Sequence, residues 1–538
     1  MVAIEYSPIG IVGYNCMVRS TLGRSLQIKR KQKDDQPSIE GDDALRGNVS
    51  LVRRTTAFAE TEMASRRARS DVNRDALTES VKEHRKVIED LIDLIDDVGD
   101  LSIVAWCSGC LERHPQRKVD RRALTPDAYI CGGCGAATTK CLVPGCKHFA
   151  IRKPGLVQLG KYCAEHLHVI PSFKKLDTKL TDLESYASWL EHDSRHAKRI
   201  STYAGAAVGG ALVLVPAFFL AAPAIGGAIG AWSGLSGAAA SSHGLALLGG
   251  GALSAGGFGM AGGTAVVSAA GGGLGSALGA SVASAYVGDD SSFHIEVLKR
   301  GEGPKVVFAS GFLTEPDVGW NGWEQIILSR YPDATVYRLR WGSKEQADLR
   351  AMFTHQGVAN GAAAALAKKA SAATKLALKK VAPANAALAA AGVAKNPWWV
   401  ARTRAKMTGA VLADLIARTD AEDFILIGHS LGAHVMFSAA EALGSRDGSP
   451  QLESVHLLGA AVSADRDVTD VAKAVHGTVW NYWSSNDAVL RRAYRGAELG
   501  KHAAGARGFA KSAPSVKNRD VSRQVADHGA YVSRVTLS

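Results

Sequence analysis

The pentapeptide Gly-His-Ser-Leu-Gly at residues 428–432 constrains the fold of this chain more than any other feature. An apolar run, residues 424–427, precedes it, and a helix-like stretch, residues 433–443, follows it. A serine at a sharp turn between a strand and a helix is typical of a nucleophile elbow, where flanking glycines avoid collisions with neighbouring backbone. Because a free serine is a poor nucleophile, this interpretation requires a base, an acid and an oxyanion hole elsewhere.

The base and the acid are predicted from chain order, which runs serine, acid, histidine in α/β-hydrolase folds. His528 lies near the C-terminus, where a loop after a final strand is expected, whereas the alternative, His502, lies in a Gly-, Ala- and Arg-rich stretch. Asp487 follows a strand-like run and a polar turn, and Asp465 after an earlier run is its alternative. The predicted catalytic residues are therefore Ser430, Asp487 and His528.

The oxyanion hole needs two backbone N–H donors directed at the developing negative charge. One donor is expected from Leu431, the residue after the serine. The strand-like run 305–309 is followed by Ser-Gly-Phe-Leu, and Phe312 in this loop is the predicted second donor. The elbow, the oxyanion loop, the acid and the histidine occur in the order of an α/β hydrolase. Together they indicate a serine hydrolase more strongly than the pentapeptide does alone.

Seven of the eight cysteines fall between residues 107 and 163; six form three pairs with short spacers, and Cys163 forms a fourth pair with His166. Thiolates at such spacing enclose a tetrahedral ion, so the pattern predicts zinc rather than disulfides. We expect two structural zinc ions, with sequential pairing and cross-braced pairing both open, and with His148 as the alternative to His166. The predicted ligands are Cys107, Cys110, Cys131, Cys134, Cys141, Cys146, Cys163 and His166.

The zinc-binding module is expected to present a surface to a protein partner. Basic residues between two of its cysteine pairs favour a solvated charged loop, and nucleic acid binding is not expected. These residues are Arg117, Lys118, Arg121 and Arg122.

Residues 200–288 contain no Asp, Glu, Lys or Arg, although the whole chain carries a net charge of +12. Apolar runs of about 18 residues or more predict membrane spans, and small residues at every fourth position favour close helix packing in lipid. We expect a hairpin of two spans, about 204–232 and within 244–287. Lys198 and Arg199 precede it, which predicts that both flanking regions lie on the cytoplasmic side. A buried Gly/Ala-rich segment or a flexible linker is the alternative.

The chain is long enough for several domains, and the expected fold class is α/β. An α/β-hydrolase fold would follow an N-terminal helical region, a small zinc-binding module and a Gly/Ala-rich transmembrane hairpin. The expected organisation is 1–50 partly disordered, 51–100 helical, 101–170 zinc-binding module, 175–200 amphipathic helix, 201–288 membrane hairpin and 291–538 hydrolase domain.

Five sets of short runs are similar to those of a known family. They are residues 310–313, 396–398 with 401–415, 427–433, 457–460 and 485–490. On these runs the chain resembles the family catalogued as domain of unknown function 726, over about 291–538 and the preceding apolar hairpin. The resemblance implies a membrane-associated α/β hydrolase with Ser430, Asp487 and His528 at the triad positions. The cysteine-rich module is not a feature associated with that family.

Three functions follow from these patterns. The leading hypothesis is a membrane-associated serine hydrolase, of lipase or esterase type, that cleaves carboxylic esters of membrane lipids without a catalytic cofactor. Membrane lipids or other acyl esters would be its substrates, and the basic charge would favour anionic surfaces. The second is an inactive hydrolase-fold scaffold that recruits a partner through the zinc module. The third is a pore-forming membrane effector.

Overall fold

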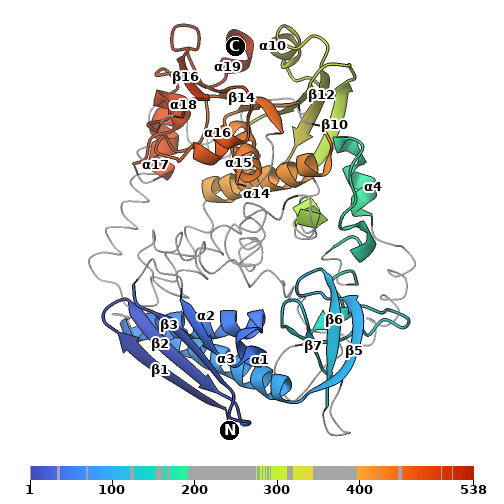
Figure 1. The fold of residues 1–538 in the computed structure, drawn as a ribbon. Helices are drawn as coiled ribbons and strands as arrows, with labels where there is room; N and C mark the ends of the chain where they lie inside the picture. The colour runs from blue at the N-terminus through green and yellow to red at the C-terminus, as the bar shows by residue number, and fades with distance from the viewer. Residues whose placement is uncertain are drawn as a thin grey trace. The chain divides into compact units, whose positions relative to one another are not determined.

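The computed structural model divides the described residues into two compact units (Figure 1). One unit lies within residues 1–176, and the other combines residues 177–191 with the described residues from 274 onward. The described residues are 2–32, 37–67, 71–120, 127–152, 162–166, 170–191, 274, 279–280, 283–284, 286–287, 290, 292–311, 319–342, 397–421, 423–445, 451–498, 500–511 and 513–538.

The first unit begins with a four-stranded antiparallel sheet in the order β1-β2-β3-β4. Its elements are β1 (Ala3–Ile9), β2 (Gly13–Arg19), β3 (Ser25–Arg30), β4 (Ser38–Gly41), α1 (Asp43–Arg46), α2 (Val49–Arg67) and α3 (Asp71–Asp96). Cys16 and Ile28 point from the sheet into a core that Phe58 and Ile92 close from α2 and α3. The structure therefore differs from the partly disordered segment expected at 1–50, because the alternating apolar residues of β2 and β3 bury one face of the sheet.

A five-stranded antiparallel sheet completes the first unit and carries the cysteines. Its strands are β5 (Val98–Trp106), β6 (Arg113–Val119), β7 (Tyr129–Cys131), β8 (Ala137–Lys140) and β9 (Phe149–Ile151), and a 3-10 turn, η1 (Phe173–Lys175), follows. The connections from β5 to β6, from β7 to β8 and from β8 to β9 place the first three cysteine pairs at strand ends. The sheet is too small to enclose a large apolar core of its own.

Residues 177–191 pack on the second unit as short turns instead of the amphipathic helix expected at 175–200. The 3-10 turn η2 (Leu183–Ser185) leads directly into α4 (Tyr186–Leu190). The Asp182 side chain caps η2 by accepting from the Ser185 N–H at 3.0 Å. Before the turn, the Leu180 N–H donates to the Arg418 carbonyl at 2.9 Å, and this tertiary contact fixes an extended backbone where a helix was expected.

The second unit is built on a seven-stranded sheet in the order β10-β12-β11-β13-β14-β15-β16. The strands are β10 (His294–Lys299), β11 (Lys305–Ala309), β12 (Thr335–Arg340), β13 (Phe424–His429), β14 (Leu452–Leu458), β15 (Val479–Trp483) and β16 (Val516–Asp520). All neighbours pair in parallel except β10 with β12. Every residue of β13 is buried, as expected of a central parallel strand covered on both faces. The expected α/β class is thereby confirmed.

Helices connect the parallel strands and cover the sheet. They are α10 (Glu324–Leu328), α14 (Pro397–Arg418), α15 (Leu431–Gly444), α16 (Thr469–Lys473), the π-helical turn η5 (Val489–Tyr494), α17 (Arg495–Ala497), α18 (Ala504–Arg507) and α19 (Tyr531–Arg534). Helix α14 packs along α15 (Figure 1), and a Cβ at Gly409 would lie 2.6 Å from the Val435 carbonyl oxygen. The loops after β11, β13 and β15 therefore meet at one edge of the sheet, because parallel strands end on the same side.

The predicted membrane hairpin at 201–288 lies outside the described residues, apart from a few positions between 274 and 287. Within the part of the chain that the structure describes, no helix is both long enough and apolar enough to cross a membrane. The two-span hairpin and its orientation therefore stay predictions.

Candidate active site and cysteine clusters

Ser430 stands at the tip of a sharp turn between β13 and α15. Its backbone has φ +58° and ψ −118°, a conformation that a residue with a side chain rarely adopts. Such backbone strain is typical of functional sites, where the surrounding structure holds it in place. The strand, the strained serine and the helix are the local geometry that the pentapeptide predicts.

The glycines of the pentapeptide are required by close backbone contacts. A Cβ at Gly428 would lie 2.4 Å from the Gly432 carbonyl oxygen, and a Cβ at Gly432 would lie 2.2 Å from the Ala309 carbonyl oxygen. Gly311, in the loop after β11, is equally constrained, since its Cβ would lie 2.6 Å from the Ser430 Cβ. The predicted oxyanion loop therefore passes directly beside the serine.

His528 lies between Ser430 and Asp487 and makes a hydrogen bond to each. Its Nε2 is 2.8 Å from the Ser430 Oγ, and its Nδ1 is 2.7 Å from the Asp487 Oδ2. All three side chains are buried, with exposed fractions of 1%, 0% and 3% for Ser430, Asp487 and His528. The structure thus brings together the three residues that chain order selected.

Asp487 is held in place from its other side. Its Oδ1 accepts a hydrogen bond from the Leu490 N–H at 2.9 Å, which leaves Oδ2 for the imidazole. The alternatives lie elsewhere: Asp465 is exposed, and the His502 carbonyl accepts from the Ala464 N–H. Among the described residues, no hydrogen bond joins either of them to Ser430.

The predicted oxyanion donors are only partly described. Leu431 is the first residue of α15, so its N–H has no acceptor within the helix and points from the helix N-terminus beside Ser430. Phe312 lies outside the described residues, and its neighbours Ser310 and Gly311 are the last described positions of that loop. Trp323 steadies the loop by donating from Nε1 to the Ser310 Oγ at 3.0 Å.

His429, inside the pentapeptide, is a residue of this site that the sequence analysis did not select. Its ring packs against that of His528 with centroids 4.9 Å apart, and its Nε2 is 2.8 Å from the His528 carbonyl oxygen. Burial lowers the pKa of His429 to about 3, so the ring is neutral and its Nε2–H donates to that carbonyl. His429 therefore positions the backbone that carries His528. His429 occupies a variable position of the pentapeptide, so the motif alone did not indicate this role.

The first cysteine cluster joins the ends of β5 and β7. Cys107 Sγ is 3.9 Å from Cys134 Sγ, and Cys110 Sγ is 4.0 Å from Cys131 Sγ. All eight cysteines are free thiols, and these separations are far longer than a disulfide bond. Sulfurs that share one tetrahedral ion at about 2.3 Å lie about 3.8 Å apart, so the four atoms fit a single metal ion. At the first knuckle the Gly109 N–H donates to the Cys107 Sγ at 3.2 Å.

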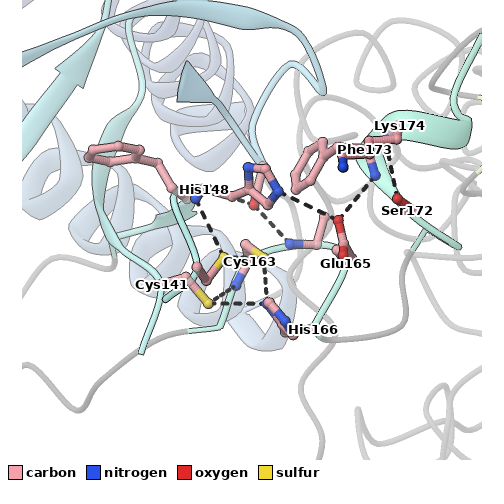
Figure 2. Close-up of polar contacts among 12 residues, drawn as sticks. Cys141, His148, Cys163, Glu165, His166, Ser172, Phe173 and Lys174 are labelled. Atoms are coloured by element: carbon pink, nitrogen blue, oxygen red, sulfur yellow. Dashed lines mark hydrogen bonds and ion pairs between the residues drawn. The ribbon is translucent and has the colours of Figure 1, made fainter. Parts of the chain in front are cut away.

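The second cluster combines Cys141, Cys146, Cys163 and His166. The His166 Nδ1 is 3.4 Å from the Cys141 Sγ and 3.1 Å from the Cys163 Sγ, and Figure 2 shows these groups converging. The two groups are therefore paired sequentially along the chain rather than cross-braced. Both clusters can hold a metal ion, as the spacing predicted.

His148 is excluded from the second cluster by its own contacts. Its Nε2 faces a Glu165 carboxylate oxygen at 3.6 Å, and its ring packs on Phe173 with centroids 4.6 Å apart (Figure 2). Its backbone N–H donates to the Cys146 Sγ at 3.4 Å. His148 thus contacts a cluster cysteine through its backbone, while His166 is the histidine that completes the second group of four possible ligands.

The two clusters are linked through one buried serine. Ser108, next to Cys107, donates to the Phe149 carbonyl at 2.7 Å and accepts from the Ala164 N–H at 2.8 Å. Ala164 follows Cys163, so this side chain connects a ligand loop of each cluster. The cysteine-rich module is therefore one connected structure rather than two separate knuckles.

The second unit thus defines a mixed α/β protein in which a strained serine begins a buried Ser–His–Asp hydrogen-bond chain. The chain belongs to the family described as protein of unknown function (DUF726), whose model matches residues 195–537. The resemblance that the sequence motifs carried is thereby confirmed. No solved protein structure matches the chain at a significant level.

Curated relatives match short parts of the chain. An uncharacterized membrane protein of Schizosaccharomyces pombe is 32% identical over 140 residues, which are 25% of this chain and 18% of the relative. An uncharacterized membrane protein of Caenorhabditis elegans is 33% identical over 156 residues, 28% of this chain and 25% of the relative. A probable lipase of Saccharomyces cerevisiae is 36% identical over 108 residues, 20% of this chain and 10% of the relative. The matches therefore span a quarter or less of these relatives' own length.

Proposed function

We propose that the second unit is an α/β-hydrolase-fold serine hydrolase that cleaves carboxylic esters of membrane lipids. The observation that carries this proposal is the hydrogen-bond chain from the Ser430 Oγ through His528 to the Asp487 carboxylate. The strained backbone at Ser430 supports it, because it is the conformation of a nucleophile elbow. The probable lipase among the relatives is consistent with this chemistry.

In this mechanism the Ser430 Oγ attacks the acyl carbonyl while the His528 Nε2 takes the hydroxyl proton. Asp487 accepts from the Nδ1–H of His528, which fixes the tautomer with Nε2 free to act as a base and stabilises the imidazolium that forms. His528 then gives the proton to the departing alcohol, and an acyl-enzyme remains on Ser430. Water hydrolyses the acyl-enzyme by the same proton transfers in reverse.

The Leu431 N–H is the donor that stabilises the tetrahedral oxyanion, and the loop after Gly311 supplies the second donor, which we assign to Phe312. The contact of Gly311 with Ser430 supports this assignment, because only a residue without a side chain lets the loop approach the nucleophile so closely. Each such donor typically contributes about 10²–10³-fold to the rate.

The lipid substrate follows from membrane association, which the two relatives named as membrane proteins support. The uncharged apolar stretch between residues 200 and 288 is the segment we assign to the membrane, with both units on its cytoplasmic side. Esters of membrane lipids would then be the substrates nearest to Ser430.

The two cysteine clusters are proposed to hold one structural Zn²⁺ each. A Cys₄ set and a Cys₃His set are donor sets that zinc prefers, and each already provides four ligands. A closed tetrahedral set leaves no position for substrate, so these ions would stabilise the first unit and leave the ester chemistry to Ser430. The surface of this module is the one we assign to a protein partner.

The experiment that tests the hydrolase is labelling of the purified full chain with a fluorophosphonate probe in detergent or liposomes. We expect rapid labelling of the wild type, none of Ser430→Ala, and a rate about 10⁴-fold lower for Asp487→Asn. Ser533→Ala, which changes a serine exposed on α19, is the matched control and keeps the wild-type rate. Labelling that persists in Ser430→Ala, or a folded wild type that does not react, would contradict the proposal and favour an inactive scaffold.

A further inference from the structure

Three cationic side chains lie on elements that contact α15, the helix that follows the nucleophile elbow. A Cβ at Gly409, one turn after Lys406 on α14, would lie 2.6 Å from the Val435 carbonyl oxygen of α15, and Arg466 pairs with Glu441 of the same helix. Arg402 and Lys406 project from successive turns of α14, and Arg466 projects from the loop after β14. The short connection from α14 to β13 places the end of the helix at the start of the strand. The first half of α14, with these residues, therefore lies toward the edge where the parallel strands end and where Ser430 stands.

Two of the three cations are neutralised by carboxylates. Arg402 donates to both oxygens of Glu498, at 2.5 and 2.6 Å. Arg466 donates to both oxygens of Glu441, at 2.8 and 2.7 Å. Lys406 differs, since among the described residues its ammonium makes no ion pair and no hydrogen bond. Lys406 is therefore the cation of this cluster that has no carboxylate bound to it among the described residues.

The surroundings of Lys406 make that charge unfavourable. Burial, together with the charges of Arg402 and Arg466, lowers the pKa of Lys406 to about 7, although the carboxylates of Glu441 and Glu498 act in the opposite direction. By solvent-accessible area, Lys406 as a whole residue is nevertheless only partly buried. An anion that contacts Lys406 would restore its charged form.

His434 connects this cluster to the active serine. It lies one turn after Ser430 on α15, its Nδ1 is 2.8 Å from the Ala461 carbonyl oxygen, and the Ala461 N–H donates to the Ser430 carbonyl at 3.2 Å. Burial holds the pKa of His434 well below its usual value, and the charges of Arg402 and Lys406 lower it further. His434 is therefore neutral, and it does not add a competing charge next to Lys406.

We propose that Lys406 is the anchor of a subsite for the phosphate group of an acyl ester substrate, such as a phospholipid or a lysophospholipid. This inference rests on the proposed hydrolase function of Ser430. A lysine ammonium binds phosphate as a point charge, and it is the cation of this cluster that has no carboxylate of its own. Phosphate is also the anionic group that most membrane phospholipids carry next to their acyl esters. Lys406 would thus select phosphate-bearing esters over neutral ones.

The kinetic test compares dihexanoyl phosphatidic acid with dihexanoylglycerol as substrates of the full chain. We expect Lys406→Met to lower the ratio of kcat/KM for the first substrate to that for the second by about 10- to 100-fold. Lys406→Arg should restore most of the ratio, because it keeps the charge. Lys473→Met is the matched control, since Lys473 is an exposed lysine of the same unit that pairs with Asp470. An equal change of the ratio in Lys473→Met, or no change in Lys406→Met, would overturn the subsite.

A binding test separates the subsite from the hydrolase. Dihexanoyl phosphatidic acid is titrated by calorimetry into Ser430→Ala and into Ser430→Ala with Lys406→Met, and inorganic phosphate is titrated in parallel. We expect the lipid to bind Ser430→Ala more tightly than phosphate does, and to bind the double variant about 10-fold or more weaker. If the wild type does not react with fluorophosphonate but the double variant still loses lipid binding, the hydrolase is rejected and the subsite is kept. Equal lipid binding by the two variants, or phosphate binding as tight as lipid binding, would reject the subsite alone.

Discussion

The two units of this chain differ in how they accommodate buried polar groups. In residues 1–176, seven cysteines and a histidine converge in two clusters, and every well-exposed large apolar side chain of the described residues lies in this unit. In the second unit, Asp414 and Arg418 form an ion pair with no exposed side-chain area. The His528–Asp487 pair is nearly as buried, at 2% and 0%.

This difference shows what stabilises each unit. The sheet of β5 to β9 carries apolar residues such as Leu101 and Val104 on its surface, at 68% and 56% exposure, so it encloses little apolar volume. Val119 and Ile130 connect this sheet to the core of the N-terminal sheet and helices, and the metal ions proposed for the two clusters would add cross-links at its strand ends. The parallel sheet of the second unit lies in a continuous apolar core and needs no ion to stay folded. The sheet of β5 to β9 should therefore depend on the proposed metal ions, whereas the second unit should not.

Metal removal is the change with the largest expected effect on this comparison. Structural zinc typically contributes about 10 kcal/mol of apparent binding free energy at neutral pH, so its loss should unfold the sheet of β5 to β9. Hydrogen exchange after dialysis against a chelator should show lost protection in these strands and full protection in β13 and β14. The same pattern is expected for Cys131→Ser, whose thiol belongs to the first cluster.

The control for this experiment is Cys16→Ala, which removes the cysteine that lies outside both clusters, in the core of the N-terminal sheet. It should keep two metal ions per chain by elemental analysis. Protection of β5 to β9 that survives complete metal removal would contradict the comparison, because the sheet would then be stable without an ion.

The second largest effect is expected from the buried ion pair of α14. Arg418 Nε is 3.0 Å from the Asp414 Oδ2, and the Arg418 guanidinium lies 4.2 Å above the Trp189 ring. Asp414→Ala would leave the guanidinium buried without its carboxylate, which typically costs about 3–5 kcal/mol. Urea unfolding, followed by hydrogen exchange in β13, should show a loss of this size in the second unit and none in the first.

The exposed pair of Lys473 and Asp470 is the control for the ion pair, with side-chain exposures of 61% and 43%. Asp470→Ala should change the free energy of unfolding by less than about 1 kcal/mol, as for exposed pairs in general. Equal losses in the two variants would mean that burial does not set the energy of ion pairs in this unit.

The candidate site was largely predictable, because its residues follow the ends of parallel strands in a known order. Ser430, Asp487 and His528 were each selected from position along the chain, and the structure hydrogen-bonds them to one another. His429 was not selected, since its role depends on a carbonyl that is 99 residues away in the chain. The cysteine spacing predicted the ligands, whereas their sequential pairing needed the fold.

The parts that the sequence analysis missed are those where tertiary contacts decide local structure. The strands of the N-terminal sheet are short and carry many charges, such as Arg19 and Lys29, so their alternation resembled a polar, disordered segment. The helical periodicity after Leu180 predicted a long helix, but the backbone contact with Arg418 holds Leu180 extended, and only the short turns η2 and α4 follow in the described residues. Hydrophobic periodicity therefore predicted secondary structure poorly where a strand or helix distant in the sequence provides the hydrogen-bond or packing partner.

The smallest predicted effect is the pH dependence of stability in the second unit. It would sharpen the comparison because it arises from buried histidines of that unit and not from the cysteine clusters of the first. His456 is fully buried, with its Nε2 2.7 Å from the Tyr331 hydroxyl and its Nδ1 3.1 Å from the Tyr482 hydroxyl. Burial lowers the pKa of His456 to about 3, so the folded protein keeps this ring neutral at pH values where the unfolded chain protonates it. Stability should then be fully present above about pH 6.5 and fall by about 1.4 kcal/mol per pH unit as the pH decreases toward 3.

His429 carries a similar lowered pKa of about 3, and burial also holds the pKa of His434 well below its usual value, so three buried histidines contribute to the slope in the second unit. His456→Gln should remove the share of His456 and leave those of His429 and His434, which makes the loss of stability between pH 6.5 and 5 shallower by about 1.4 kcal/mol per unit. Hydrogen exchange in β14 across this range measures the slope for the second unit alone. An unchanged slope in His456→Gln would contradict the share of acid sensitivity assigned to His456 and would leave the slope to the other buried histidines, His429 and His434.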